Sequence, residues 1–257
     1  MNKNLRERQS EYEKEYNIIL DEKYTWFCIR LDGKGFSKRI KKWKCNIPFD
    51  WDFHCAMCDG IKYLMKEIPA IKLGWTGSDE VTLLFKSSDE YYSNRINKLL
   101  SLTSSMMTYA FNKSMFITHE NLLRIEIPED KYDILEYGAF FDSRIITPPD
   151  LCECLNNFVY RQQDCIRNSI SMWFSKFYSH KQTMKKNSDE KIQIMIDEQG
   201  FDWNTTPANW TKYGELFYYN KEQHIREEDN TEYFRNVIYC DSKKFTGTDL
   251  LKLLNIE

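Results

Sequence analysis

The sequence predicts an α+β fold, with a ferredoxin-like β-α-β-β-α-β core in its first half and a mainly helical second half. Two patterns carry this prediction: short runs rich in β-branched and aromatic residues, and longer stretches that repeat apolar residues at helical spacing. The chain has 257 residues, enough for one large domain or a core with an appendage. We expect residues 1–148 to form the core with an N-terminal helix, and residues 149–257 to pack on it within one compact unit.

In the first half, residues 1–20 have the pattern of a polar leading helix, with Tyr12, Tyr16 and Ile19 spaced to dock one side. Residues 24–31 are β-branched and aromatic, which predicts a buried strand, and a basic connector at 38–44 follows it. The remaining predicted elements are a helix from about 50 to 68, a hairpin of strands 70–75 and 81–85, a helix at 89–113 and a strand at 137–147. This order gives the β-α-β-β-α-β core.

In the second half, helical spacing predicts a long helix from about 150 to 178 and another at 188–199. Short strands are expected near 214–219 and 233–240. These elements make the second half mainly helical.

Composition bounds the class of protein. The formal charge of −3 and the pI of about 5.9 exclude an overall basic nucleic-acid binder, although a local basic face remains compatible with them. Eight cysteines accompany an N-terminus without a secretory apolar region, so we expect reduced thiols and a cytoplasmic protein, with an organellar location as the alternative. No apolar run has the length needed to span a bilayer, so no membrane partner is expected.

Two acidic motifs stand where predicted strands end. Asp32 follows the first strand, and Asp79 lies at the tip of the hairpin. In a split β-α-β sheet the first strand runs antiparallel beside the third, so these two carboxylates should meet. Such a pair raises the pKa of each group unless a cation neutralises it, and Mg²⁺ binds one or two carboxylates together with substrate phosphates. We therefore predict two Mg²⁺ ions that serve nucleotidyl transfer.

The glycine-rich turn after Asp32 suits the phosphates of a nucleotide. Glycines at 33 and 35 let the backbone approach a phosphate closely, and Lys34 adds a positive charge. The alternative is structural: Asp32-Gly33 is then a plain strand-to-turn signal, and Asp79-Glu80 is a solvated hairpin tip.

The long helix of the second half is amphipathic. At helical spacing one stripe is polar and the opposite stripe is apolar. The polar stripe holds Asn157, Arg161, Asp164 and Asn168, and the apolar stripe holds Ile166, Ile170, Trp173 and Phe177. The polar stripe offers arginine and amide donors to phosphates, and its alternative role is a solvated face.

Several sequence motifs, and their order along the chain, resemble those of the tRNA-His guanylyltransferase superfamily, the 3′-to-5′ polymerases. The resemblance is strongest to its branch of tRNA-His guanylyltransferase-like proteins. The main stretches are Arg-Leu-Asp-Gly-Lys-Gly-Phe-Ser at 30–37, Ser-Asp-Glu at 78–80, Phe-Asp-Ser-Arg at 141–144 and the helical residues 161–170. Residues 177–181, 200–203 and 212–214 also fit, so the likeness covers roughly residues 24–220.

The resemblance implies a polymerase-palm fold, with a second region that binds tRNA and its 5′ end. It implies two Mg²⁺ ions, ATP and GTP or other nucleoside triphosphates as substrates, tRNA as partner and a homotetramer. Its catalytic residues would be Asp32, Asp79 and Glu80, with metal held by Asp32, the carbonyl of Gly33 and Asp79. Its nucleotide contacts would be Asp32, Gly33, Lys34, Gly35, Phe36, Ser37, Ser78 and Asp79. Contacts to tRNA or a 5′ phosphate are expected at Lys42, Lys44, Arg161, Gln162, Asp164, Arg167, Asn168, His180 and Lys181.

The sequence departs from the family pattern in three places. Gly77 replaces the glutamine common before Ser-Asp-Glu, and Ile47 replaces a lysine often found before the Pro-x-Asp element. The His-x-Asn-Asn-like motif of true histidine-tRNA enzymes is also missing. These differences favour templated repair of 5′-truncated tRNA over guanylate addition to tRNA-His. A true tRNA-His guanylyltransferase, a palm-type nucleotide cyclase and a non-catalytic tRNA-binding module remain the alternatives.

The cysteines give a weaker signal. Cys55 and Cys58 form a Cys-x-x-Cys pair, but a structural zinc site usually needs a second close pair. Cys152-x-Cys154 lacks that spacing, so ordinary packing of Cys58 is the favoured interpretation.

Overall fold

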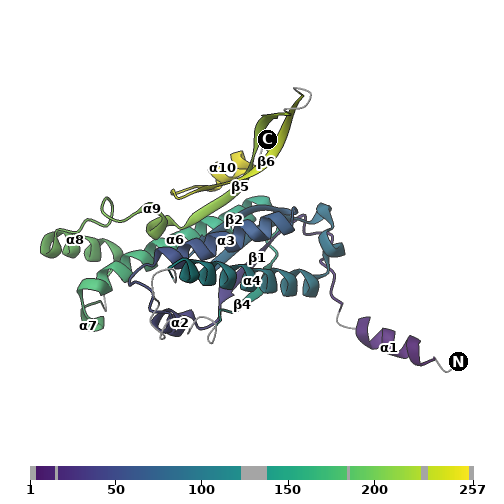
Figure 1. Cartoon of the computed structure of the whole chain (residues 1–257), viewed down its shortest axis with the longest axis horizontal. Helices are drawn as coiled ribbons and strands as arrows, with labels where there is room; N and C mark the ends of the chain where they lie inside the picture. Colours follow the sequence, from purple (N-terminus) through teal and green to yellow (C-terminus); the bar gives the residue numbers. More distant parts are fainter. Residues whose placement is uncertain (1–3, 15–16, 123–137, 184–185, 227–230, 255–257) are drawn as a thin grey trace.

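One six-stranded antiparallel sheet organises the chain (Figure 1). The structure is a computed structural model and describes residues 4–14, 17–122, 138–183, 186–226 and 231–254, without the side chains of 117–122 and 180. The strand order is β4-β1-β3-β2-β5-β6. The strands are β1 (Trp26–Gly33), β2 (Ile71–Gly77), β3 (Glu80–Lys86), β4 (Phe141–Ile146), β5 (Glu215–Ile225) and β6 (Glu232–Asp241). Strand β1 pairs antiparallel with β3, with Asp32 opposite Glu80, which confirms the expected arrangement of the first and third strands.

Helices cover the sheet and flank it. They are α1 (Leu5–Lys14), α2 (Phe36–Lys42), α3 (Trp51–Glu67), α4 (Ile96–Leu122), α6 (Leu151–Phe177), α7 (His180–Thr183), α8 (Ser188–Gln199), α9 (Asn209–Tyr213) and α10 (Gly247–Leu253). Two 3₁₀ turns, η1 (Ser87–Asp89) and η2 (Tyr91–Asn94), precede α4. Among the residues that the structure describes, no helix has the length and apolar character needed to cross a membrane. The fold class is therefore α+β, as the sequence predicts.

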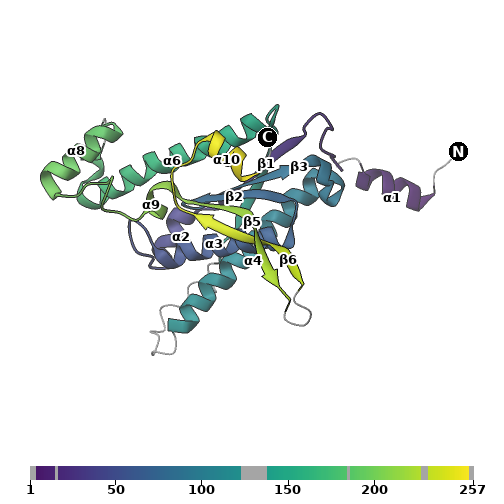
Figure 2. The ribbon, with the colours of Figure 1, turned by 90° about the horizontal axis from the view of Figure 1, so that it is seen from above.

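The core has three layers, because side chains of each strand alternate between the two faces of the sheet. Figure 2 shows α3 and α4 on one side of the sheet and α6 with α10 on the other. In β1, Phe27 and Ile29 join the buried cluster under α3 and α4, whereas Cys28 joins the cluster under α6. Asp32 and Arg30 share the parity of Cys28 along the strand, so they point toward α6.

Local capping explains where the two main helices begin. The Asp50 side chain accepts a hydrogen bond from the backbone of Phe53 at the start of α3. The Asp150 side chain accepts one from the backbone of Glu153 at the start of α6. Both satisfy an amide that the helix itself leaves without a partner. The predicted boundaries of α3, α6 and α8 agree with the structure within a few residues.

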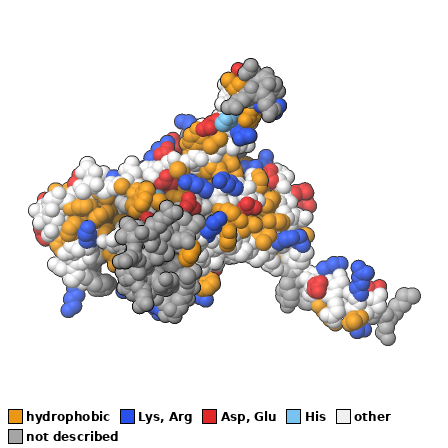
Figure 3. Space-filling model, viewed as in Figure 1, with side chains coloured by type: hydrophobic (Ala, Val, Ile, Leu, Met, Phe, Trp, Pro, Cys, Tyr) orange, Lys and Arg blue, Asp and Glu red, His pale blue; other side chains and the backbone are white. Residues whose placement is uncertain are grey.

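Three local predictions were wrong. Helix α1 buries none of its residues, and Tyr12 and Ile19 are 62% and 60% exposed, so the leading helix does not dock on the body (Figure 3); Tyr16 lies outside the described residues. The basic connector at 38–44 is mostly helix α2, which starts at Phe36. Residues 89–94 form 3₁₀ turns with left-handed backbone at Glu90 and Tyr92, so helix α4 begins later than its apolar pattern indicates.

The two halves of the chain share the sheet. Strand β5 of the second half pairs with β2 of the first half, from Thr76↔Glu215 to Leu73↔Tyr218. Strands β5 and β6 then continue as a long hairpin that projects from the body (Figure 1). The second half therefore contributes two strands that are longer than expected as well as its helices.

Candidate active site

Acidic side chains form a row across the ends of three neighbouring strands. Asp32 of β1 lies opposite Glu80 of β3 on one side and opposite Asp142 of β4 on the other. Opposed residues of antiparallel strands have Cβ atoms about 5 Å apart, so the three carboxylates share one face of the sheet. This arrangement concentrates negative charge at the strand ends that α6 crosses. We call this row of Asp32, Glu80 and Asp142 the acidic edge.

Asp79 lies at the hairpin tip beside this row. Ser78 takes a left-handed backbone conformation (φ 57°), and its hydroxyl donates to the Asp79 carboxylate at 3.2 Å. The Gly33 amide donates to the Asp79 carbonyl at 3.1 Å, which ties the tip to the end of β1. Burial raises the pKa of Asp79, and the negative charges of Asp32 and Glu80 add to that rise. The structure thus brings Asp32 and Asp79 into electrostatic contact although 47 positions separate them in the sequence (79 − 32).

Glu80 is held by two arginines. The Nε of Arg161, from α6, donates to Glu80 Oε2 at 2.9 Å, and the guanidinium of Arg30 pairs with the other carboxylate oxygen. Arg30 also lies 3.4 Å from an Asp32 oxygen. The two positive charges compensate Glu80, so its carboxylate is anchored in place.

The turn after β1 closes against the loop before β4. The Lys34 amide donates to the Phe140 carbonyl at 2.8 Å, and the Arg39 Nε donates to the Gly138 carbonyl at 3.0 Å. Gly35 has φ 66°, a conformation that favours glycine and turns the chain into α2. Phe36 is buried among aromatic rings, including Phe53 and Phe111, so it anchors the turn in the core.

A pocket of about 380 Å³ is lined both by residues of the acidic edge and by aromatic side chains. Its polar lining includes Ser37, Ser78, Asp79, Glu80, Arg161 and Asn168. Its apolar lining includes Ile40, Ile47, Pro48, Phe49, Met172 and Trp210. Both its volume and its mixed polar and apolar lining are typical of small-molecule sites.

The other predicted contact residues differ in how far they are exposed. Gln162 is buried. Its side-chain amide donates to the carbonyls of Tyr213 and Lys243 and accepts from the Phe245 amide, so both ends of the side-chain amide are bonded to the main chain. The exposed residues are Lys34, Lys42, Lys44, Arg167, Asn168 and Lys181. Arg167 pairs with Asp164, which also pairs with Arg161. The side chain of His180 lies outside the described residues.

The structure gives a physical reason for the glycine at position 77. A Cβ there would lie 2.5 Å from the indole of Trp75 and 2.8 Å from the sulfur of Cys165. A glutamine therefore cannot occupy this position unless the indole moves. Ile47 is 67% exposed at the rim of the pocket, so it leaves that rim without the positive charge of a lysine.

Charged residues of the site that were not among the predicted site residues include Asp142, Arg30 and Lys41. Asp142 and Arg30 are placed by the register of β1, and Lys41 lines the pocket where Lys42 and Lys44 do not. The pairing of β1 with β4 could have revealed Asp142, since it follows from the same fold prediction. Nothing in the local sequence distinguishes Lys41 from its basic neighbours.

Comparison with known proteins gives consistent relatives. The sequence profile of the family described as Thg1, tRNAHis guanylyltransferase, matches residues 6–149. The tRNA(His) guanylyltransferase of Schizosaccharomyces pombe is 27% identical over 215 residues, which cover 79% of this chain and 77% of that protein. A bacterial tRNA(His) guanylyltransferase (Thg1)-like protein, solved in complex with ATP, superposes with a TM-score of 0.71 at 31% identity, covering 84% of this chain and 87% of that one. Another such structure, in complex with GTP, has a TM-score of 0.64 at 27% identity and covers 90% of each chain.

The family profile and these structural relatives define the class of protein as a nucleotidyltransferase. The family profile spans more than half of the chain, so the chain belongs to the tRNAHis guanylyltransferase (Thg1) family.

Proposed function

We propose that this protein is a metal-dependent 3′-to-5′ nucleotidyltransferase that adds nucleotides to the 5′ end of tRNA, in templated repair of 5′-truncated molecules. The observation that carries the proposal is the pair Asp32 and Asp79, at adjoining strand ends beside a pocket that has both acidic and aromatic lining residues. A polymerase-palm fold is the architecture that we propose for the sheet and its acidic edge.

The donor set fits divalent metal. Burial and neighbouring negative charge raise the pKa of Asp79, which means that the folded site favours a compensating cation. Asp32, the carbonyl of Gly33 and Asp79 would supply hard oxygen ligands of the kind that Mg²⁺ takes. Two bound Mg²⁺ ions would stabilise charge on the attacking and leaving oxygens of an in-line displacement. Glu80, already paired with Arg30 and Arg161, would position the strand end beside these ligands.

The pocket fits a nucleoside triphosphate, ATP or GTP. Its polar lining residues would take the phosphates, with Ser37 and Ser78 as hydroxyl donors and the turn at 33–37 alongside. Its aromatic lining residues Phe49 and Trp210 would take the base by stacking. The bacterial relatives that bind ATP and GTP support this assignment.

We assign the RNA end to the exposed residues of the predicted set. Asn168 lines the pocket, and its neighbour Arg167 on α6 is exposed. Lys42, Lys44 and Lys181 are exposed cations that suit the sugar-phosphate backbone, which attracts positive charge regardless of sequence. Gln162 would support the site structurally and would not contact RNA, since its amide is already bonded to the main chain.

Repair is favoured over guanylate addition to tRNA-His because the residues at 161–164 replace the motif of the histidine-tRNA enzymes. Arg161 is turned toward Glu80, and Gln162 toward the segment at 243–245. Neither side chain is free to form hydrogen bonds with the end of a tRNA, as two exposed asparagine side chains would be.

The test offers labelled nucleoside triphosphates to the purified protein together with 5′-truncated tRNAs that differ in the opposing 3′-strand base. We expect Mg²⁺-dependent addition that follows the template, and its loss in Asp32→Asn and Asp79→Asn. Asp197→Asn, on the outer helix α8, controls for the change in charge and should keep full activity. Addition of guanylate to tRNA-His alone would contradict repair, and turnover of the triphosphates without RNA would indicate a cyclase.

We also propose a homo-oligomer, a tetramer by family resemblance. Two projecting elements expose apolar side chains: Leu5 on α1 is 65% exposed, and Phe234 on β6 is 65% exposed. Strand β6 is also an edge strand of the sheet, and an edge strand can pair with a strand of another chain. Light scattering after size-exclusion chromatography measures the mass, and a monomer at micromolar concentration would contradict the proposal.

A further inference from the structure

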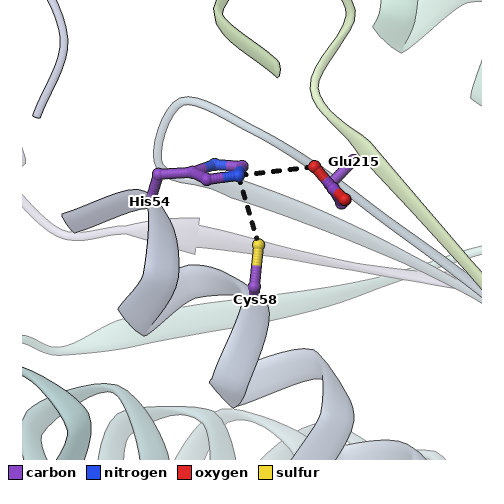
Figure 4. Close-up of side chains that lie close together, drawn as sticks. All are labelled: His54, Cys58 and Glu215. Atoms are coloured by element: carbon purple, nitrogen blue, oxygen red, sulfur yellow. Dashed lines mark hydrogen bonds and ion pairs between the residues drawn. The ribbon is translucent and has the colours of Figure 1, made fainter. Parts of the chain in front are cut away.

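Three side chains of metal-ligating type converge at the wall of the pocket, outside the acidic edge. They are His54 and Cys58 of α3 and Glu215, the first residue of β5 (Figure 4). His54 and Cys58 are four positions apart and therefore lie on one face of the helix. Their donor atoms and a Glu215 oxygen all lie within 4.8 Å of one another. The three side chains are shielded, with exposed fractions of 11% for His54, 8% for Cys58 and 13% for Glu215.

Hydrogen bonding does not account well for this geometry. The Nε2 atom of His54 faces both the Cys58 sulfur, at 3.5 Å, and the Glu215 Oε2, at 3.4 Å. A charge-assisted N–H···O bond is normally about 2.8 Å long, so the second contact is loose. One ring nitrogen also cannot accept the thiol proton and donate a proton to the carboxylate at the same time. When Nε2 carries a proton and donates to the carboxylate, it faces a sulfur that accepts only weakly, so hydrogen bonding leaves at least one of the two contacts weak.

The same distances match the separations between ligands around a tetrahedral zinc ion. Zinc lies about 2.3 Å from thiolate sulfur, about 2.0 Å from imidazole nitrogen and about 2.1 Å from carboxylate oxygen, so tetrahedral angles place N and S about 3.5 Å apart and N and O about 3.3 Å apart. The observed separations are 3.5 Å and 3.4 Å. A thiolate and a carboxylate together also balance the charge of a divalent ion, with the imidazole neutral.

We propose that His54, Cys58 and Glu215 bind a structural zinc ion that fastens α3 to the first residue of β5. Sulfur and imidazole ligands select zinc over Mg²⁺, which prefers oxygen, so this site is chemically distinct from the acidic edge. Three protein ligands leave the fourth tetrahedral position to a water molecule.

The surroundings suit a structural ion. The Ser242 hydroxyl donates to the Glu215 carboxylate, and the His54 ring stacks on Trp210 with 4.4 Å between ring centroids. Contacts of this kind orient metal ligands and hold them in place. Because His54 and Trp210 also line the pocket, the ion would stiffen this part of the pocket wall.

The test is metal binding by the tag-free full chain after treatment with a chelator. Co²⁺ is added in the presence of excess Mg²⁺, and the absorption spectrum is recorded. We expect one Co²⁺ per chain, with the sulfur-to-cobalt charge-transfer band and strong visible bands of tetrahedral coordination, and displacement by one equivalent of Zn²⁺. The charge-transfer band requires a thiolate ligand, so Co²⁺ bound by Asp32 and Asp79 cannot produce it.

Matched variants decide the assignment. Cys58→Ala should lose the band, whereas Cys55→Ala, three positions earlier on the same helix, should keep it. Glu215→Gln keeps the shape of the side chain and should weaken Zn²⁺ binding by at least about tenfold, which protects the test if Cys58→Ala does not fold. Absence of the band in the wild-type protein, its persistence in folded Cys58→Ala, or its loss in Cys55→Ala would overturn the proposal. Asp79→Asn should keep the band, so the result does not depend on the proposed enzymatic function.

Discussion

Arg161 and Glu80, 81 positions apart in the sequence, form an ion pair that joins α6 to the end of β3. The side chain of Arg161 is 9% exposed, and Arg30 engages the same carboxylate from the strand beside it. The pair therefore links the helix of the second half to the acidic edge of the first. A buried charge that loses its partner is costly, so this link is required for the geometry of the site.

Removal of Arg161 should destabilise the protein far more than removal of a neighbouring arginine. We expect Arg161→Met to lower the free energy of unfolding by about 3 kcal/mol, because Glu80 then loses one of its two partners in a shielded site. Arg167→Met, on the same helix but 55% exposed and paired with Asp164, should lower it by about 0.5 kcal/mol. Urea denaturation of the two variants gives both values. Equal losses would show that the Arg161 pair contributes no more than a surface pair.

Gln162 should behave as a structural residue. Its amide satisfies two carbonyls and one backbone N–H in buried segments. Gln162→Ala would leave these groups without partners and should lower the free energy of unfolding by about 3 kcal/mol. Its exposed neighbour gives the control, since Gln163→Ala should change stability by less than about 0.5 kcal/mol. A stable Gln162→Ala variant with weakened tRNA binding would instead support a direct contact.

The sheet and its acidic edge were predictable because they follow from strand order. Once residues 24–31 and 81–85 are taken as the first and third strands, Asp32 and Asp79 must approach each other. The partner of Glu80 was not predictable, because amphipathic spacing shows which face of α6 is polar but not which strand end that face covers. Helix spacing likewise placed Tyr12 on a docking face that the structure leaves exposed, since a pattern does not show whether a surface is there to receive it.

The His54, Cys58 and Glu215 cluster shows a further limit of sequence reasoning. The Cys-x-x-Cys pair drew attention to Cys55. The side chains that meet are instead His54 and Cys58, one helical turn apart, and Glu215, about 160 positions later in a strand that only the pairing of β2 with β5 brings close. Spacing rules detect ligands that are close in sequence, so they missed Glu215.

Gly77 should not tolerate a side chain. A Cβ at this position would lie 2.5 Å from Trp75 and 2.8 Å from Cys165, so Gly77→Ala should lower the free energy of unfolding by about 2 kcal/mol through overpacking. Gly247→Ala is the matched control, because its Cβ would make only an ordinary contact, 3.6 Å from Asn156, at the start of α10. Thermal melting compares the two. If Gly77→Ala melts at the wild-type temperature, the indole of Trp75 moves freely, and a glutamine could be accommodated.

Neutralisation of Asp79 should stabilise the metal-free protein. Burial raises the pKa of Asp79, so ionised Asp79 costs stability at neutral pH, and Asp79→Asn removes that cost. In a chelator, we expect the variant to melt above the wild type. On addition of Mg²⁺ the wild type should gain stability by mass action, whereas the variant should gain little. An equal response of both proteins to Mg²⁺ would contradict the assignment of Asp79 as a ligand.

Glu215 should make stability depend on pH. Burial alone would raise the pKa of Glu215, but hydrogen bonds from His54, Ser242 and Cys240 outweigh it and lower the pKa below its ordinary value of 4.5. A carboxyl with a lower pKa in the folded chain stabilises that state above its ordinary value, and this contribution is lost as the pH falls through the folded pKa. The difference in unfolding free energy between wild type and Glu215→Gln should therefore be greatest at neutral pH.

This difference should shrink as the pH falls below 4.5. Urea denaturation across the acidic range measures it, with a chelator present so that bound metal does not contribute. Glu232→Gln, an exposed position on β6, corrects for the change in net charge. A difference that stays constant with pH, or grows toward acid, would show that the three hydrogen bonds do not stabilise the ionised carboxylate.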